Sequence, residues 1–446
     1  MNDLGHGLAL GAAKEGFRLS MLVYDTRFRA ITIQVVVLIL FLLLVGWLVD
    51  NTIQNLAAKD KDINFGFLWV RAGYDIEQQL IPYTNDSTHG RAVIVGLLNT
   101  LVIAGFGCVL ATIIGVLAGV LRLSKNWLVS RLMTIYVEAF RNVPLLLWII
   151  LVFVVTSETQ PAPADFKVTQ AMVDSWATED TSDDIYPAAS KILFGTAAVT
   201  NRGSYVATPV LDRPLGGTTL GSVPINFSVL ATIAAIVGSV LANRALLRRA
   251  KAVQEETGIR PVTWWKSLLI LFGPTVLLLV AMGFHLQLPA FAADENGVSK
   301  GFNFQGGILV QHSFTALLIA LSLYTGAFIA EIVRAGILAI SRGQTEASFA
   351  LGVRPGRTMN LIILPQALRV IIPPLISQYL NLTKNTSLGI AVSYLDLRGT
   401  LGGITLNQTG RELECMLLMM LTYLIISLII SGAMNLYNNA VKLKER

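Results

Sequence analysis

The feature that most limits the fold of this chain is a series of long apolar runs without a charged side chain. One run extends over residues 92–121, where thirty consecutive positions carry no Asp, Glu, Lys or Arg. A helix of about 20 apolar residues crosses the roughly 30 Å hydrocarbon layer of a bilayer. Charged residues make up only 14% of the chain, too few to cover a water-soluble domain. The sequence therefore predicts an all-α, multi-pass membrane protein.

Eight segments have the length and composition of a membrane-spanning helix. The seventh is unusual, because Pro373 and Pro374 interrupt it and polar residues occupy positions 381–387. Such a segment is expected to be buried among other helices rather than to face lipid. The predicted spans cover residues 31–49, 92–121, 133–155, 225–243, 267–285, 313–330, 370–395 and 415–434.

Small side chains on one face of the second span predict close helix packing. Ala111, Gly115 and Gly119 lie four residues apart, and such a ladder lets a neighbouring helix approach closely. Cys108 and Cys415 both lie within apolar runs. We therefore expect these cysteines to pack in the protein interior rather than to form a disulfide framework or a metal site.

Basic residues are distributed unequally between the two alternating sets of loops. One set carries 21 Lys and Arg residues and the other 11, so the positive-inside rule places the first set, with both termini, in the cytoplasm. This asymmetry also explains the net charge of +6, and we expect no nucleic-acid partner. The predicted cytoplasmic segments are 1–29, 122–131, 244–266, 334–369 and 438–446, and the external ones are 50–91, 156–224, 289–312 and 394–412.

One cytoplasmic stretch, residues 345–365, has the pattern of a short helix, a turn and a second helix. Thr345 is a suitable N-cap, and Gly352 is expected to end the first helix. Residues 354–356 predict the turn, and Pro365 is expected to interrupt the helix that follows. The small side chains of the first helix would allow another protein to approach closely.

This stretch resembles the EAA loop of bacterial ABC importer permeases, by which the membrane subunit docks onto its ATPase. The likeness rests on Glu346-Ala347-Ser348, on Gly352 six positions after Glu346, and on Ile362-x-Leu364-Pro365. Ser348 stands where that family usually has a third alanine. By this resemblance, the residues expected to couple the chain to an ATPase are Glu346, Ala347, Ser348, Leu351, Gly352 and Pro365.

Four further motifs resemble the five-helix core of the polar amino acid permease subfamily, which includes histidine and glutamine importers. An additional first span and a two-span insertion also resemble one membrane subunit of the general L-amino acid permeases of proteobacteria. The resemblance implies the fold of an ABC type I importer. The motifs are Asn99-Thr100, Tyr136-Val137-Glu138-x-x-Arg141-x-x-Pro144-Leu145-Leu146, Ala330-Glu331-Ile332-x-Arg334-x-Gly336-Ile337 and Lys384-Asn385-Thr386-Ser387-Leu388.

The resemblance divides the chain into a permease core with an insertion. The segment 156–224 within the insertion carries no catalytic motif, and we expect an external loop or a small cap there. The expected parts are residues 1–91 with the cytoplasmic N-terminus, the first span and an external loop, 92–156 with the first part of the core, 157–312 with the insertion and spans four and five, 313–437 with the second part of the core, and 438–446 as a cytoplasmic tail.

Two pairs of opposite charges lie near the cytoplasmic ends of the third and sixth spans. Glu138 and Arg141 are three residues apart, as are Glu331 and Arg334, so each pair can meet on one helix face. Two interpretations stay open. The pairs could offset the cost of burying each charge, or they could form a cytoplasmic gate or an anchor for the coupling loop.

Polar side chains inside the broken seventh span are candidates for the transport path. Asn385, Thr386 and Ser387 offer an amide and two hydroxyls that could hold the ammonium and carboxylate groups of an amino acid, and Lys384 offers a positive charge. Thr325 of the sixth span is a further candidate. Interhelical hydrogen bonding that fixes the bundle is the alternative. The subfamily often has Asp at the position of Asn385, so its absence favours neutral and acidic substrates over cationic ones.

The chain contains no G-x-x-x-x-G-K-[ST] phosphate-binding motif, so we expect another polypeptide to bind ATP. Its four histidines are not clustered with cysteines or paired carboxylates, and no metal site is expected. The resemblance implies that this chain is not an enzyme and binds no cofactor itself. An ABC ATPase dimer would hold ATP and Mg²⁺, and a second, related permease chain and a periplasmic amino-acid-binding protein would complete the complex in the lipid of the bacterial inner membrane.

We therefore expect a permease subunit of an ATP-driven importer with a broad range of neutral and acidic polar L-amino acids. An ion-coupled secondary transporter that uses the broken seventh span as its binding site is the main alternative. A membrane scaffold without a transport path is a second alternative. The cytoplasmic stretch 345–365 favours the importer, because a secondary transporter has no need of it.

Overall fold

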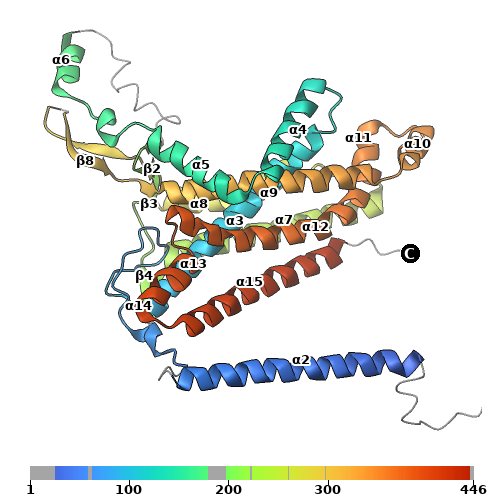
Figure 1. The fold of residues 1–446 in the computed structure, drawn as a ribbon. Coiled ribbons are helices and arrows are strands. Elements are labelled where there is room, and N and C mark those ends of the chain that lie inside the picture. Colours follow the sequence, from blue (N-terminus) through green and yellow to red (C-terminus); the bar gives the residue numbers. More distant parts are fainter. Residues whose placement is uncertain are drawn as a thin grey trace, which may run out of the picture. The chain divides into compact units, whose positions relative to one another are not determined.

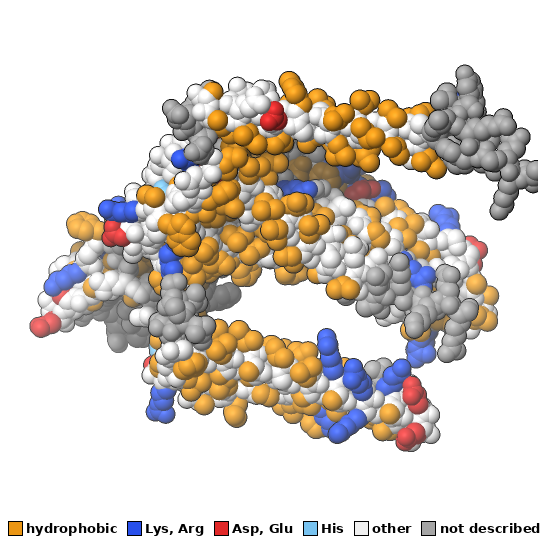
Figure 2. All heavy atoms as spheres, turned by 90° about the horizontal axis from the view of Figure 1, so that it is seen from below, with side chains coloured by type: hydrophobic (Ala, Val, Ile, Leu, Met, Phe, Trp, Pro, Cys, Tyr) orange, Lys and Arg blue, Asp and Glu red, His pale blue; other side chains and the backbone are white. Residues whose placement is uncertain are grey.

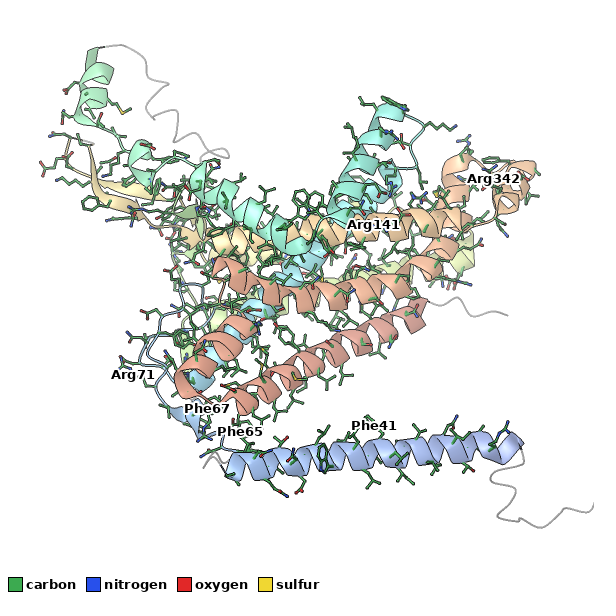
Figure 3. The ribbon with its side chains drawn as sticks, in the orientation of Figure 1. Phe41, Phe65, Phe67, Arg71, Arg141 and Arg342 are labelled. Atoms are coloured by element: carbon green, nitrogen blue, oxygen red, sulfur yellow. The ribbon has the colours of Figure 1, made fainter. Side chains whose placement is uncertain are left out.

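The computed structural model describes residues 26–58, 63–178, 197–220, 223–259, 261–296 and 298–441. The chain forms two compact units, residues 1–66 and 67–446. The first unit contains the helix α2 (Thr26–Ala57), whose apolar side chains, Phe41 among them, are exposed along its length (Figure 3). This helix confirms the first predicted span. Residues 1–25, residues 179–196 of the predicted loop 156–224 and residues 442–446 of the tail lie outside the described residues.

The second unit consists of long helices, short helical segments and small sheets (Figure 1). Its longer helices are α3 (His89–Leu121), α4 (Trp127–Asn142), α5 (Leu145–Glu158), α6 (Gln170–Thr178), α7 (Phe227–Thr257), α8 (Trp264–Ala281), α9 (His312–Leu338), α10 (Arg342–Ala350), α12 (Leu364–Asn385) and α15 (Glu412–Val441). The short helical segments are η1 (Gly66–Trp69), η2 (Pro163–Phe166), α11 (Pro355–Thr358), η5 (Met359–Ile363), η6 (Thr386–Val392), α13 (Leu397–Gly399), η7 (Thr400–Thr405) and α14 (Leu406–Thr409). The strands are β1 (Ala197–Thr200), β2 (Gly203–Val206), β3 (Thr208–Leu211), β4 (Gly217–Leu220), β5 (Val223–Asn226), β6 (Phe284–Gln287), β7 (Ala290–Ala293), β8 (Ser299–Gln305) and β9 (Ile308–Val310).

Helix α9 lies at the centre of the bundle and packs against α3, α4, α5 and α12. Leu317, Leu321 and Ile329 of this helix are completely buried. Among the described residues, seven helices are long and apolar enough to cross a membrane, or eight if the bent pair α4 and α5 forms one span. The prediction of about eight spans is confirmed.

The predicted third span, residues 133–155, is not one straight helix. It is divided between α4 and α5, whose axes differ by 109°, and Figure 1 shows the two helices diverging at this break. Val143 is extended there (φ −106°, ψ 135°), directly before Pro144. A proline lacks an N–H group and disfavours helical backbone at the preceding residue, which explains the position of the bend.

The insertion forms small antiparallel sheets that the sequence did not predict. Strand β2 pairs with β9, so that Ser204 lies opposite Val310. Strand β3 pairs with β6, and His285, which was predicted to end the fifth span, lies in β6 instead. The fourth span likewise begins at Phe227, because Ile225 belongs to β5. Two loops that the charge distribution assigned to the same side of the membrane are therefore joined by backbone hydrogen bonds.

Hydrophobic side chains cover the sides of the helices, whereas charged ones gather toward helix ends (Figure 2). Helices α7 and α8 illustrate this surface. They pack mainly against each other, and Leu277 of α8 is 74% exposed. An apolar surface of this size on a helix long enough to span a membrane indicates contact with lipid or with another membrane subunit.

The glycine ladder of α3 lies directly against α9. A Cβ atom added at Gly115 would lie 2.6 Å from the side chain of Ile329, and one added at Gly119 would lie 2.6 Å from the carbonyl oxygen of Ala330. Real Cβ atoms do not approach other atoms so closely. The close packing predicted from the spacing of small residues is therefore confirmed.

Replacing Gly115 with valine is expected to separate α3 from α9 and to destabilise the protein by about 1–3 kcal/mol or more. The measurement is the thermal unfolding midpoint of the purified, detergent-solubilised protein. Gly105→Val is the matched control, because it lies on the same helix and an added Cβ has no atom within 4 Å. Equal midpoints for the two variants would contradict this interpretation of the ladder.

Candidate functional site

The stretch predicted to be cytoplasmic contains the helix α10, which is separated from the end of α9 by residues 339–341. Its N-cap is Ser341, in extended conformation (φ −60°, ψ 140°), so the prediction that Thr345 caps this helix is wrong. Both residues are suitable caps. Because α9 already ends at Leu338, the next helix can begin directly after Ser341. Gly352 closes the helix with φ +71°. That left-handed conformation is one that glycine adopts without steric strain.

The second helix of this stretch begins at Pro355 rather than after the predicted turn at 354–356. Proline suits the first position of a helix, because the N–H group that it lacks would have no partner there. The helix continues through the π-helical turn η5 into α12. Pro365 does not end this helix, but the backbone bonding changes directly before it, where residues 359–363 form the π-helical turn.

The surface of α10 is exposed and partly apolar. Glu346, Ala347 and Leu351 are exposed, and the Leu351 side chain is 82% exposed. Ser348 instead faces inward, and its hydroxyl donates to the carbonyl oxygen of Gln344 at 2.6 Å. A small side chain is therefore required at position 348, and the exposed residues around it are free to contact another protein.

A cluster of charged side chains joins α3, α4 and α9 close to this stretch. Glu331 accepts hydrogen bonds from Arg122 and, at 2.7 Å, from Arg334. Arg141, labelled in Figure 3, lies 3.8 Å from the same carboxylate. The local pair predicted on α9 therefore forms. Glu138 lies 3.8 Å from Arg122 of α3, so the two charges predicted to pair on α4 contact other helices instead.

Arg122 is the residue of this cluster that the sequence did not identify. Its side chain is only 9% exposed, although its position directly after an uncharged run suggested a loop residue. The cluster ties three helices together, and α9 leads into α10 after only residues 339–341. The geometry therefore suits either a structural role or an anchor for the coupling stretch.

The polar residues of the seventh span differ in their surroundings. Thr386 is buried, and its hydroxyl donates to the carbonyl oxygen of Thr383 at 2.9 Å. The hydroxyl of Ser387 donates to the carbonyl oxygen of Lys384 at 2.8 Å. Both hydroxyls thus bond to the backbone of their own helix. The side chain of Lys384 is exposed and that of Asn385 is half-buried. Thr325 is buried within α9.

A buried carboxylate, Asp396, lies beside these residues and was missed in the sequence. It accepts hydrogen bonds from the backbone N–H of Gly399 at 2.9 Å and from the hydroxyl of Tyr423 at 3.2 Å, and the hydroxyl of Thr386 lies 3.5 Å away. The signal that could have found it is a lone acidic residue within an otherwise apolar segment between the last two spans.

The motif Asn99-Thr100 holds the segment that contains Asp396. The side-chain amide of Asn99 donates to the carbonyl oxygen of Leu395 at 2.9 Å, and the hydroxyl of Thr100 accepts from the backbone N–H of Leu397 at 3.0 Å. These contacts cross nearly three hundred residues of sequence. They give this motif a structural function in joining α3 to the end of the seventh span.

Comparison with known proteins assigns the chain to a family. Residues 111–443 match the profile of the family described as "Binding-protein-dependent transport system inner membrane component". The chain is 62% identical over 440 residues to the glutamate/glutamine/aspartate/asparagine transport system permease protein BztB of Rhodobacter capsulatus, covering 98% of this chain and 100% of that protein. It is 38% identical over 431 residues to the general L-amino acid transport system permease protein AapQ of Rhizobium johnstonii, covering 97% and 96%. It is also 40% identical over 420 residues to the putative amino-acid ABC transporter permease protein YhdX of Escherichia coli, covering 94% and 95%. With its bundle of spanning helices and a profile match over most of its length, the chain belongs to the family of binding-protein-dependent transport system inner membrane components.

Proposed function

We propose that this chain is a permease subunit of an ATP-driven importer of polar amino acids in the bacterial inner membrane. The observation that carries the ATP-driven mechanism is the exposed helix α10, which bears Glu346 and Leu351 on its surface and is linked to the central helix α9 by three residues. The substrate class is supported by the names of the relatives, of which one is a permease for glutamate, glutamine, aspartate and asparagine. Residues 92–156 and 313–437 form the proposed core.

The proposed complex contains an ATPase dimer that holds ATP and Mg²⁺, a second permease chain related to this one, and a periplasmic amino-acid-binding protein. In this arrangement the ATPase contacts α10 through Glu346, Ala347, Leu351 and Gly352, while Ser348 and Pro365 shape the loop from within. Closure of the ATPases moves α10, and the motion reaches α9 and the charge cluster around Glu331. Because α9 packs against α3, α5 and α12, its motion changes the packing of the whole core.

The experiment that tests this function is reconstitution into liposomes. Uptake of L-glutamine is measured with ATP enclosed and the binding protein outside, with and without the ATPase subunits, and again under a sodium or proton gradient without ATP. The proposal expects uptake only with ATPase and ATP. An ion-coupled secondary transporter would instead show uptake by this chain alone under the gradient, which would overturn the proposal.

Replacing Asn385 with aspartate tests whether the seventh span lines the path. We expect ATP-driven uptake of L-glutamate to fall relative to L-glutamine by at least about tenfold, because like charges a few ångströms apart repel by more than about 1.4 kcal/mol. Competition between the two labelled amino acids measures this ratio. Asn435→Asp, at an exposed position on α15 outside the seventh span, is the control. A scaffold without a path predicts altered stability and an unchanged ratio.

A further inference from the structure

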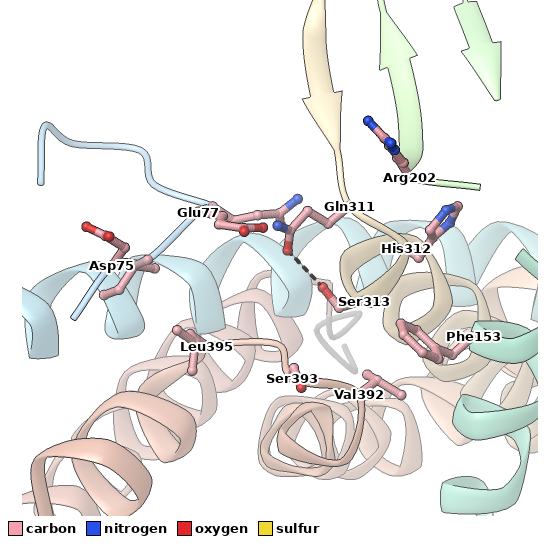
Figure 4. A pocket seen from close by; sticks show the side chains of 12 residues that line it. Asp75, Glu77, Phe153, Arg202, Gln311, His312, Ser313, Val392, Ser393 and Leu395 are labelled. Atoms are coloured by element: carbon pink, nitrogen blue, oxygen red, sulfur yellow. Dashed lines mark hydrogen bonds between the residues drawn. The ribbon is translucent and has the colours of Figure 1, made fainter. Parts of the chain in front are cut away.

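A cavity of about 380 Å³ lies at the N-terminal end of α9 (Figure 4). Four further parts of the chain contribute to its walls, namely residues 75–78 before α3, Phe153 of α5, the turn between β1 and β2 that carries Arg202, and the segment 392–395 at the end of η6. Residues 75–78 and Arg202 belong to loops that the charge distribution places outside the membrane, and the segment 392–395 lies at the end of the predicted seventh span that leads into another such loop. Its volume is within the range of about 300–1,000 Å³ that is usual for small-molecule sites.

A buried histidine, one of whose ring nitrogens has no hydrogen-bond partner among the described residues, lines this cavity. His312 is only 7% exposed, and its Nε2 atom has no partner within the described part of the chain. Buried polar atoms in proteins are nearly always hydrogen-bonded, and an orphaned one calls for an explanation such as a bound group. Figure 4 shows the His312 ring rising from the first turn of α9, on the side of the cavity where Arg202 lies.

The cavity carries opposite charges on different parts of its wall. Asp75 and Glu77 provide carboxylates, and Arg202 provides a guanidinium group that donates one hydrogen bond to Asn303 at 2.9 Å. The first turn of α9 adds backbone N–H groups that have no partner within the helix, and the side chain of its N-cap, Gln311, makes no capping bond. Different parts of the cavity wall therefore offer acceptors for an ammonium group and donors for a carboxylate.

We propose that this cavity is an outer binding site for a zwitterionic amino acid. Its carboxylate would contact the N-terminus of α9, Nε2 of His312 and Arg202, and its ammonium group would contact Glu77, which lies beside Gln311 in Figure 4. Apolar side chains complete the wall. The inference rests on the proposed function and deepens it, because it names a place that holds the substrate before it enters the membrane. With two carboxylates against one guanidinium, the site favours L-glutamine over L-glutamate.

The test is equilibrium binding of radiolabelled L-glutamine to the full transporter complex in lipid nanodiscs, without the binding protein. Saturable binding is expected, with a dissociation constant at least about tenfold higher in His312→Leu and in Arg202→Gln. Arg202 is exposed, so its variant keeps the test valid should the histidine variant fail to fold. His285→Leu, which removes an exposed histidine of β6 beside Asp212, is expected to bind as the wild type does.

Absence of saturable binding, or equal affinity in Arg202→Gln and the wild type, overturns the inference. The inference is also overturned if Arg202→Gln lowers only the stimulation of ATP-driven uptake by the binding protein and leaves glutamine binding unchanged. The cavity would then be a contact for that protein. ATP-driven uptake is measured in the same preparations. Uptake without glutamine binding at this cavity refutes the outer site alone, whereas binding without any ATP-driven uptake refutes the proposed function and leaves the site in place.

Discussion

Replacing Leu351 with aspartate is expected to abolish ATP-driven uptake while the protein still inserts into the membrane in normal amounts. Leu351 is 82% exposed at the end of α10, so its loss costs the fold little. An apolar residue at the centre of a protein contact contributes about 2 kcal/mol or more to binding, and a buried charge in its place costs further. We expect uptake in proteoliposomes to fall at least about tenfold, with the ATPase no longer retained on purification.

The control for this result is Val262→Asp. Val262 is also an exposed apolar residue in a predicted cytoplasmic loop, between α7 and α8, and lies outside the proposed coupling stretch. The same substitution there should leave uptake near the wild-type rate. Glu346→Lys provides a second test at the exposed glutamate of α10. Normal uptake by both α10 variants would show that this surface does not bind the ATPase.

Replacing Glu331 with glutamine is expected to cause the largest loss of stability among the charged residues. The substitution removes the carboxylate that Arg122 and Arg334 share and leaves the Arg122 side chain, 9% exposed, without its main partner. Breaking a buried ion pair costs about 3–5 kcal/mol, which for a chain of 446 residues corresponds to a fall of about 3–5 °C in the unfolding midpoint. The measurement is thermal unfolding of the purified protein.

Asp86→Asn is the matched control, because it breaks the exposed ion pair with Arg71, and such pairs contribute about 0–1 kcal/mol. The double variant Arg122→Met with Glu331→Gln gives an independent check. It should be more stable than Glu331→Gln alone, since it no longer buries an unpaired charge. If Glu331→Gln and the double variant both unfold at the same temperature as the wild type, the cluster has no structural function.

The membrane spans could be predicted because each depends on the local sequence. A run such as residues 92–121 identifies α3 without knowledge of its neighbours, and the spacing of Gly115 and Gly119 also identifies the face that α9 covers. The sharp bend before Pro144 was harder to predict, because a proline within an apolar run is compatible with a mild kink as well as with a bend of 109°. The sheets were missed because their strands are only three to seven residues long, and because β2 and β3 pair with the distant strands β9 and β6.

The candidate site shows the same limit. The motif around Glu346 is local and could be found, but the choice of Ser341 over Thr345 as N-cap depends on where α9 ends. The spacing of Glu138 and Arg141 allows a pair on one helix, whereas Arg122, which contacts Glu138 in the fold, lies on another helix. Asp396 caps α13 locally through the N–H of Gly399, but Tyr423 and Thr386 reach its carboxylate only through the packing of other segments.

Entry of force through α10 is tested most directly by a photo-crosslinking amino acid placed at position 351 in the complete transporter. Illumination is expected to link this chain to the ATPase subunit, with a yield that changes when ATP is added. The same group at position 277 of α8, which is also largely exposed but lies on the apolar surface, should give no such link. A link from position 351 to the periplasmic binding protein, or none to the ATPase, would contradict the claim that force enters through α10.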